Sequence, residues 1–218
     1  MNIFIGILLS YLLGSIPFSL ILVKVFKNID LRKMGSGNIG ATNAFRTCGY
    51  KIGIPALLLD IAKGLLPVIL FSEFIKGTGL SKDSQRLLLG LASICGHNWP
   101  LYLNFKGGKG IATSFGVVIG LSLKNLFLGK IIGLIVFIWV IVFIFSGFVS
   151  LASIISAILF PIFLEIFNLP YEYKVFGILI SLFALYRHKS NIYRLLRKEE
   201  NRFNVFSRFS CQKKKTLP

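Results

Sequence analysis

A short stretch rich in glycine and lysine, LNFKGGKGIATSFG at residues 103–116, interrupts an otherwise apolar chain. Gly107, Gly108 and Gly110 lack a Cβ, so their backbone N–H groups can turn toward one point and form a nest for an anion. Lys106 and Lys109 add positive charge to the same few residues. Glycine and lysine in this spacing are typical of a site that binds phosphate.

The surroundings of this stretch support the same interpretation. A helix predicted to begin at Ile111 turns its positive end toward the loop, with Thr113 in its first turn. The stretch is not a Walker A motif, which requires Ser or Thr where the chain has Gly110. A re-entrant turn with snorkelling lysines is the alternative, but it explains the glycines or the lysines and not both. Extended backward, the motif reads GHNWPLYLNFKGGKGIAT, residues 96–113, and includes His97.

A second polar stretch, GSGNIGATNAFR at residues 35–46, satisfies G-x-G-x-x-G, and Asp60 follows at the distance of a dinucleotide-binding acid. That fingerprint needs a strand before it and a helix after it in a βαβ unit, whereas an apolar helix is predicted before it here. Three glycines and many hydrogen-bond donors in twelve residues still favour a ligand loop over a plain connecting loop. The donors are Ser36, Asn38, Thr42, Asn43 and Arg46.

A third polar region is divided between two segments. The turn SGFVSLAS, residues 146–153, offers Ser150 and Ser153, although serines in membrane helices also bond to their own backbone or to a neighbouring helix. The segment RHKSNIYRLLRKEENR, residues 187–202, has the apolar spacing of an amphipathic interfacial helix. His188 and Asn191 lie three residues apart and share one face of that helix. A lone histidine there could be structural, but its polar neighbours favour a site.

Composition predicts an all-α, polytopic membrane protein. The 218 residues are 55% hydrophobic and include 21 Phe, and the mean hydropathy is +0.76. With about 20 apolar residues needed for each span, about seven transmembrane helices are expected, near 2–24, 52–72, 85–101, 111–123, 126–146, 149–167 and 173–187. Asp60 and Lys63 fall inside the second span as an i,i+3 pair. They are either a neutralised structural pair, which we favour, or the polar floor of a site.

Charge predicts the orientation of these spans. Lysine and arginine number 25 against 8 acidic residues, and 18 of the 25 fall on one set of loops and the C-terminal segment. The positive-inside rule then places the N-terminus outside and the C-terminus in the cytoplasm. All three polar motifs fall on the cytoplasmic side. We expect one membrane-embedded domain over residues 1–204 and a basic, disordered cytoplasmic tail over 205–218, held to anionic lipid.

Together the three motifs resemble those of the bacterial membrane glycerol-3-phosphate acyltransferases that use acyl phosphate as donor. GSGNIGATNAFR and GHNWPLYLNFKGGKGIAT match at almost every defining position, and RHKSNIYRLLRKEENR matches the third motif. The resemblance covers nearly the whole chain through motif order, spacing and the seven spans of this family. The third motif departs at Lys198, where the family usually has glycine, so the end of that helix is open.

The resemblance implies roles for single residues. The predicted catalytic set is Ser36, Arg46, His188 and Asn191. Gly107, Gly108 and Gly110 are implied to form the phosphate loop, and Glu200 to be a structural partner. We expect further substrate contacts from Asn38, Thr42, Asn43, His97, Lys106, Lys109, Thr113, Ser150 and Ser153.

The residues agree with the chemistry that the resemblance implies, which is transfer of a fatty acyl group to the sn-1 hydroxyl of glycerol 3-phosphate. Acyl phosphate is a mixed anhydride whose phosphate leaves readily, so the site must mainly position two phosphate-bearing molecules and stabilise charge. Two anions require cationic pockets, which Arg46, Lys106 and Lys109 are expected to supply. His188 or a substrate phosphate oxygen would accept the proton. No cofactor and no metal ion are expected.

The alternative from another class is a secondary transporter of a phosphorylated metabolite. Transport predicts broken helices and polar groups at mid-membrane, whereas the donors here cluster at one face. The expected partners are glycerol 3-phosphate, acyl phosphate, membrane lipid and the enzyme that makes acyl phosphate. Nucleic acid is not expected, despite the net charge of +17. The expected location is the bacterial cytoplasmic (inner) membrane, with the active site facing the cytoplasm.

Overall fold

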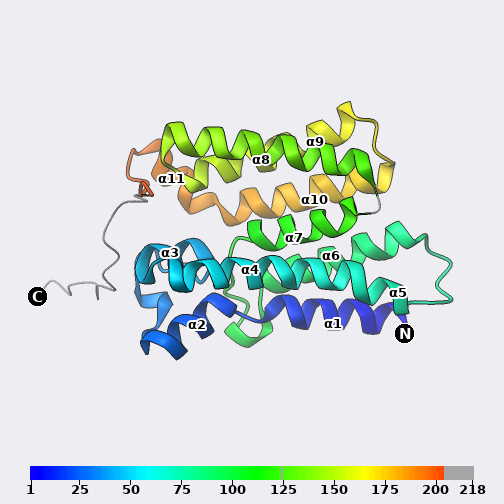
Figure 1. The fold of residues 1–218 in the computed structure, drawn as a ribbon, viewed down its shortest axis with the longest axis horizontal. Coiled ribbons are helices and arrows are strands. Elements are labelled where there is room, and N and C mark those ends of the chain that lie inside the picture. The colour runs from blue at the N-terminus through cyan, green and yellow to red at the C-terminus, as the bar shows by residue number, and fades with distance from the viewer. Residues whose placement is uncertain (124, 204–218) are drawn as a thin grey trace, which may run out of the picture.

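A computed structural model describes residues 1–123 and 125–203, so the predicted tail at 205–218 lies outside the described residues. The described chain is helical throughout and contains short 3₁₀ and π turns besides its α-helices (Figure 1). These α-helices are α1 (Ile3–Ser15), α2 (Phe18–Lys27), α3 (Ala41–Cys48), α4 (Tyr50–Leu66), α5 (Ser72–Phe74), α6 (Lys82–Asn98), α7 (Ile111–Ser122), α8 (Leu126–Ser146), α9 (Val149–Ile166), α10 (Tyr171–Arg187) and α11 (Lys189–Leu196).

Every segment predicted to span a membrane contains helix, which confirms the all-α class. Among the described residues, four helical stretches are long and apolar enough to cross a membrane. They are Ile3–Lys27, Tyr50–Phe74, Leu126–Ser146 and Val149–Ile166. The helices α6 and α10 have 17 residues each, and α7 has 12. The count of seven spans and the orientation of the termini therefore stay predictions.

The first predicted span, residues 2–24, is interrupted. α1 ends at Ser15 and α2 begins at Phe18, with Ile16 and Pro17 between them. Proline has no N–H to donate and disfavours helical backbone in the residue before it, so the chain bends there. α2 then continues to Lys27 and ends at Asn28, whose φ is 50°.

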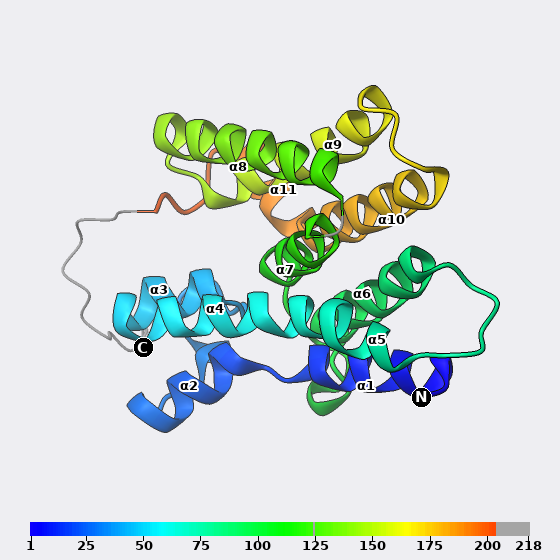
Figure 2. The same ribbon diagram turned by 45° about the vertical axis from the view of Figure 1, so that its right-hand side comes forward.

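The helices form two groups joined by α7, as the turned view shows (Figure 2). α1, α4 and α6 pack on one side, and α8, α9 and α10 pack on the other. α4 and α7 approach so closely that a Cβ on Gly64 would collide with the Thr113 carbonyl, and one on Gly116 with the Ile61 carbonyl. Small residues permit such close contact between membrane helices. α7 is thereby fixed between the two groups.

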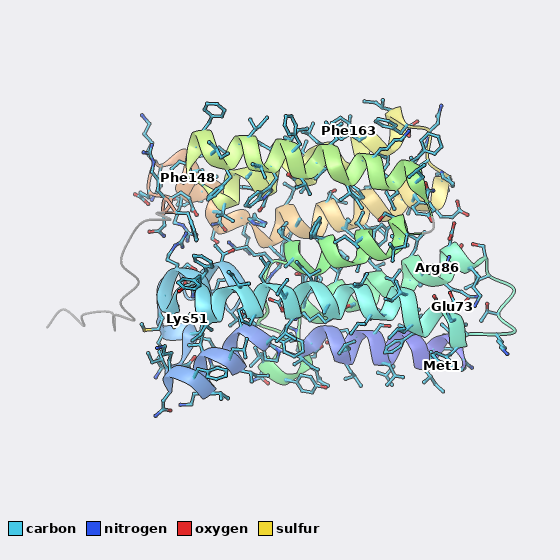
Figure 3. The ribbon with its side chains drawn as sticks, viewed as in Figure 1. Met1, Lys51, Glu73, Arg86, Phe148 and Phe163 are labelled. Atoms are coloured by element: carbon cyan, nitrogen blue, oxygen red, sulfur yellow. The ribbon has the colours of Figure 1, made fainter. Side chains whose placement is uncertain are left out.

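The two ends of the bundle differ. Lys51 and Phe148, near α3, α11 and the α8–α9 turn, mark one end in Figure 3, and Met1, Glu73 and Arg86 mark the other. The three sequence motifs meet at the first end: Arg187 contacts Gly107 and Gly108, and Arg46 contacts the backbone of Asn201. The candidate site therefore lies at the end of the bundle near Lys51 and Phe148.

Candidate active site

The loop before α3 is organised by one amide side chain. Asn43 Nδ2 donates to the carbonyls of Asn38 (2.8 Å) and Met34 (3.1 Å), and Asn43 Oδ1 accepts from the Ser36 N–H at 3.1 Å. A fully engaged amide holds the loop in shape, so Asn43 positions the motif and does not offer its donors to a ligand. Gly40 caps α3, and its N–H donates to Asn38 Oδ1 at 2.9 Å.

The glycine–lysine loop is held from behind. Its Gly108 N–H donates to the His97 carbonyl at 3.0 Å. Arg187 donates from Nε to the Gly108 carbonyl at 2.8 Å and from Nη2 to the Gly107 carbonyl at 2.5 Å. The expected nest of N–H groups is therefore wrong for Gly108, whose N–H is used within the protein. Gly110 differs, because its φ of 78° requires glycine-like backbone at the start of α7.

The third motif is arranged around Glu200. Its Oε1 accepts from Asn191 Nδ2 at 2.9 Å and from Ser150 Oγ at 3.0 Å, and its Oε2 accepts from Arg194 Nε at 2.8 Å. Burial alone would raise the pKa of Glu200, but the hydrogen bonds from Arg194, Asn191 and Ser150 lower the pKa below its usual value. Glu200 thus ties α9 to α11, which is the geometry that a structural partner requires.

The end of α11 is explained by its backbone. The helix ends at Leu196, and Lys198 adopts a φ of 60°, in the left-handed region that favours glycine. The Glu199 N–H donates to the Arg194 carbonyl at 2.8 Å, which is the long bond of a Schellman-type ending. A glycine at this position in the family would take the same conformation without strain.

His188 is buried, with 3% of its surface exposed, at the junction of α10 and α11. Nδ1 lies 2.8 Å from the Ala184 carbonyl, which can only accept, so Nδ1 carries the hydrogen and Nε2 keeps a free lone pair. Burial, reinforced by the nearby Lys109, lowers the pKa of His188 to about 4. The imidazole is therefore neutral at physiological pH and can accept a proton.

These motifs line one cavity of about 710 Å³. The predicted residues that line it are Ser36, Asn38, Thr42, Asn43, Arg46, His97, Lys109, Gly110, Ser150, Ser153, His188, Asn191 and Glu200. The predicted residues that do not line it are Lys106, Gly107, Gly108 and Thr113. Lys106 is exposed to solvent, and Thr113 is buried against α4. Contacts of these four residues with a ligand stay predictions.

The polar end of the cavity favours an anion. Residues of the first turns of α3 and α7 line it, so both helices direct their positive ends at the same space. Arg46 Nε is buried and has no partner among the described residues, while its Nη2 donates to the Asn201 carbonyl at 3.4 Å. Burial lowers the pKa of Lys109 to about 8, so Lys109 is charged at neutral pH. Phosphate matches these donors in charge and geometry.

The rest of the cavity is apolar. It continues between α4, α7, α8, α9 and α10, and its walls include Ile61, Phe115, Ile135, Trp139 and Ala157. The cavity therefore joins a cationic, hydrogen-bonding end to a hydrocarbon groove. One space of this kind can hold a molecule that carries a phosphate at one end and an apolar chain at the other.

The charged pair of the second predicted span lies beside this groove. Lys63 Nζ is 2.8 Å from Asp60 Oδ1 and donates to the Ile16 carbonyl at 2.8 Å, and both side chains are almost fully buried. The pair is thus a neutralised structural contact between α4 and the break between α1 and α2. Asp60 also lines the cavity, and its Oδ1 lies 3.7 Å from His97 Nδ1. Asp60 and Lys63 therefore form the structural pair that the sequence favoured, and Asp60 also contributes to the polar lining of the cavity.

Sequence reasoning missed two arginines at the site. Arg187 holds the glycine loop through contacts with residues about 80 positions away, which local spacing does not reveal. Arg194 lines the cavity and pairs with Glu200. It follows Asn191 by three residues, as Asn191 follows His188, so the same helical spacing could have found it.

The fold and the cavity define a class: an integral membrane protein whose polar site opens into a hydrocarbon groove. A family model described as glycerol-3-phosphate acyltransferase matches residues 4–198. A glycerol-3-phosphate acyltransferase of Shouchella clausii is 44% identical over 200 residues, which cover 90% of this chain and 93% of the relative. Another, from Desulforamulus reducens, is 42% identical over 191 residues, covering 88% and 90%. The chain belongs to the glycerol-3-phosphate acyltransferase family, and it is an acyltransferase.

Solved structures agree with this membership. The chain is similar to PlsY (YgiH), an integral membrane glycerol 3-phosphate acyltransferase, in its glycerol 3-phosphate form, with a TM-score of 0.82 and 36% identity. The lysophosphatidic acid form of PlsY gives a TM-score of 0.80 and 35% identity. In both comparisons 93% of this chain and 96% of the other chain are covered.

Proposed function

We propose that the protein transfers a fatty acyl group from acyl phosphate to the sn-1 hydroxyl of glycerol 3-phosphate. The products are 1-acyl-glycerol 3-phosphate, or lysophosphatidate, and inorganic phosphate. The observation that carries the proposal is the single cavity in which Arg46, Lys109 and two helix N-termini meet an apolar groove. The glycerol 3-phosphate and lysophosphatidic acid forms of PlsY support the acceptor and the product. Family membership disfavours the transporter alternative.

The acyl donor and the location follow from the same features. Acyl phosphate brings a second phosphate to the cationic end and a hydrocarbon chain to the groove, so both parts of the cavity are used. The enzyme acts in the bacterial cytoplasmic membrane, with the motif-bearing end of the bundle in the cytoplasm, where glycerol 3-phosphate is dissolved. Lysophosphatidate stays in the bilayer. An enzyme that makes acyl phosphate supplies the donor.

The reaction requires little activation by the protein. The acceptor oxygen attacks the acyl carbonyl carbon, a C–O ester bond forms, and the bond from that carbon to the phosphate oxygen breaks. The hydroxyl proton passes to His188 Nε2 or to a substrate phosphate oxygen, and the leaving phosphate takes the electron pair. Arg46 and Lys109 hold the phosphates, so positioning and charge stabilisation provide most of the rate.

Choice of donor tests this function. Purified protein in detergent receives radiolabelled glycerol 3-phosphate with palmitoyl phosphate, palmitoyl-CoA or palmitoyl acyl carrier protein in separate reactions. We expect labelled lysophosphatidate with palmitoyl phosphate and only background with the thioesters. Equal or greater product with palmitoyl-CoA would refute the donor.

The role of His188 is tested with the same assay. If His188 is the base, His188→Ala should lower kcat by about 10²–10⁴-fold with little change in KM, the range typical of general acid–base groups. A loss that appears mainly in KM would assign the proton to a substrate phosphate oxygen instead. Protein yield of the variant in detergent, compared with that of the unmodified protein, checks that it folds.

A further inference from the structure

The apolar groove has a closed inner end. On α9 the lining runs from Ser150 at the polar end to Phe160, and on α7 it runs from Gly110 to Val118. At a rise of about 1.5 Å per helical residue, these stretches extend about 12–15 Å from the polar end. Ile180 of α10 lies at a similar depth, because it is the lining residue farthest from His188 on that helix.

The inner end is closed because its side chains belong to a packed core. Val118, Phe160 and Ile180 are buried members of one apolar cluster that continues past them to Leu121 and Leu164, which are almost fully buried. Protein interiors of this kind are close-packed and leave no room for further methylene groups. The groove therefore ends against Val118, Phe160 and Ile180.

The side of the groove is open, in contrast with its end. Leu57 on α4 and Val136 and Val140 on α8 line the cavity, and 38–42% of their surface is exposed. Such residues form the rim of a lateral opening toward lipid. A chain in the groove thus meets a wall at the inner end and an exit at the side.

We propose that Val118 and Phe160 determine which acyl chain length the enzyme prefers; this inference rests on the proposed acyl transfer. An extended chain of single bonds advances about 1.2 Å per bond, since three bonds span 3.3–3.6 Å. A groove of about 12–15 Å therefore holds roughly 10–12 carbons in extended form. Longer chains must turn out past Val136 and Val140, where their remaining carbons contact lipid and not the protein.

Two opposite substitutions test the proposal. Phe160→Ala removes most of the side chain that closes the inner end, so more methylenes fit in the groove. Val118→Phe adds a larger side chain at the inner end and shortens the groove. The measurement is the ratio of kcat/KM for palmitoyl phosphate to that for octanoyl phosphate. In Phe160→Ala, palmitoyl fills a cavity that octanoyl leaves empty, and residual cavity volume costs about 24 cal/mol per Å³, so filling about 60 Å³ raises the ratio about tenfold. In Val118→Phe the ratio should fall, because the larger side chain takes up space that only the longer chain occupies.

Ile162→Ala is the matched control, because Ile162 lies on the same helix, is exposed to lipid and does not line the cavity. Its ratio should equal that of the unmodified protein. If Val118→Phe does not fold, Phe160→Ala carries the test alone. An unchanged ratio in Phe160→Ala would overturn the proposal while acyl transfer stands. Failure of the unmodified protein to use either acyl phosphate would instead overturn the proposed function.

Discussion

The contact between Arg187 and the glycine loop yields the sharpest prediction about positioning. Arg187 does not line the cavity, but it holds two successive carbonyls, at 2.8 Å and 2.5 Å, directly before Lys109 and Gly110, which do. Arg187→Lys keeps the charge and removes the planar fork that makes both bonds at once. The loop should then lose its fixed position without a change in the net charge of the site.

The expected loss of binding in Arg187→Lys follows from the lost hydrogen bond. A hydrogen bond from a charged donor contributes about 1.5–3 kcal/mol, so loss of one of the two is worth at most about 10–150-fold in binding. Because Lys109 and Gly110 face the phosphate end, the loss should appear as a higher KM for glycerol 3-phosphate, with a smaller change in kcat. A steady-state assay with acyl phosphate held in excess measures both constants.

The matched control is Arg197→Lys, since Arg197 is exposed directly after α11 and packs over the Tyr193 ring, away from the loop. Its KM should stay within about twofold of the unmodified value, as for surface substitutions in general. Arg187→Lys with an unchanged KM would refute the view that these bonds position the loop. An equal rise of KM in both variants would indicate a general effect of replacing arginine by lysine and would likewise refute the positioning role of Arg187.

Three further outcomes are expected. Burial lowers the pKa of Lys109 to about 8, so Lys109 loses its proton as the pH rises through that value, and the KM for glycerol 3-phosphate should rise above pH 8. Lys109→Arg should abolish this rise of KM. A rise that persists in Lys109→Arg would exclude Lys109 as its cause. Lys198→Gly should relieve the strain of a non-glycine residue in the left-handed region and raise the free energy of unfolding by up to about 1 kcal/mol, seen as a higher Tm, with activity retained. A lower Tm would contradict the strain at Lys198. In a Cys-free background, Ser190→Cys should resist an impermeant thiol reagent in intact cells and Lys76→Cys should react; labelling of both from one side would overturn the topology.

Much of the site could be predicted because its chemistry is local in sequence. The glycines beside Lys109 indicated an anion loop, and the three-residue spacing of His188 and Asn191 indicated a shared helical face. Lys109, His188 and Asn191 all line the same cavity. The length of the apolar segments predicted the helices. The break at Ile16–Pro17 has a local cause, because proline disfavours helical backbone in the residue before it. Proline alone does not locate a break, since Pro55 and Pro161 lie inside α4 and α9.

Other features depend on contacts that sequence spacing cannot reveal. Lys106 and Lys109 look equivalent in the sequence, but the irregular loop has no fixed period, and it exposes one and buries the other against the cavity. The Gly108 N–H was expected to face a ligand, yet it pairs with the His97 carbonyl, and Arg187 reaches the loop from another helix. Tertiary packing fixes these choices.

The central claim is that the acyl group moves from one phosphate-bearing molecule to another while the donor's phosphate leaves. It is tested by one reaction that contains acyl phosphate labelled in its phosphate and glycerol 3-phosphate labelled in its glycerol carbons. We expect the glycerol label in lysophosphatidate, the phosphate label in inorganic phosphate, and equal molar amounts of the two products. Donor phosphate label in the lipid product, or phosphate release without labelled lysophosphatidate, would contradict the mechanism.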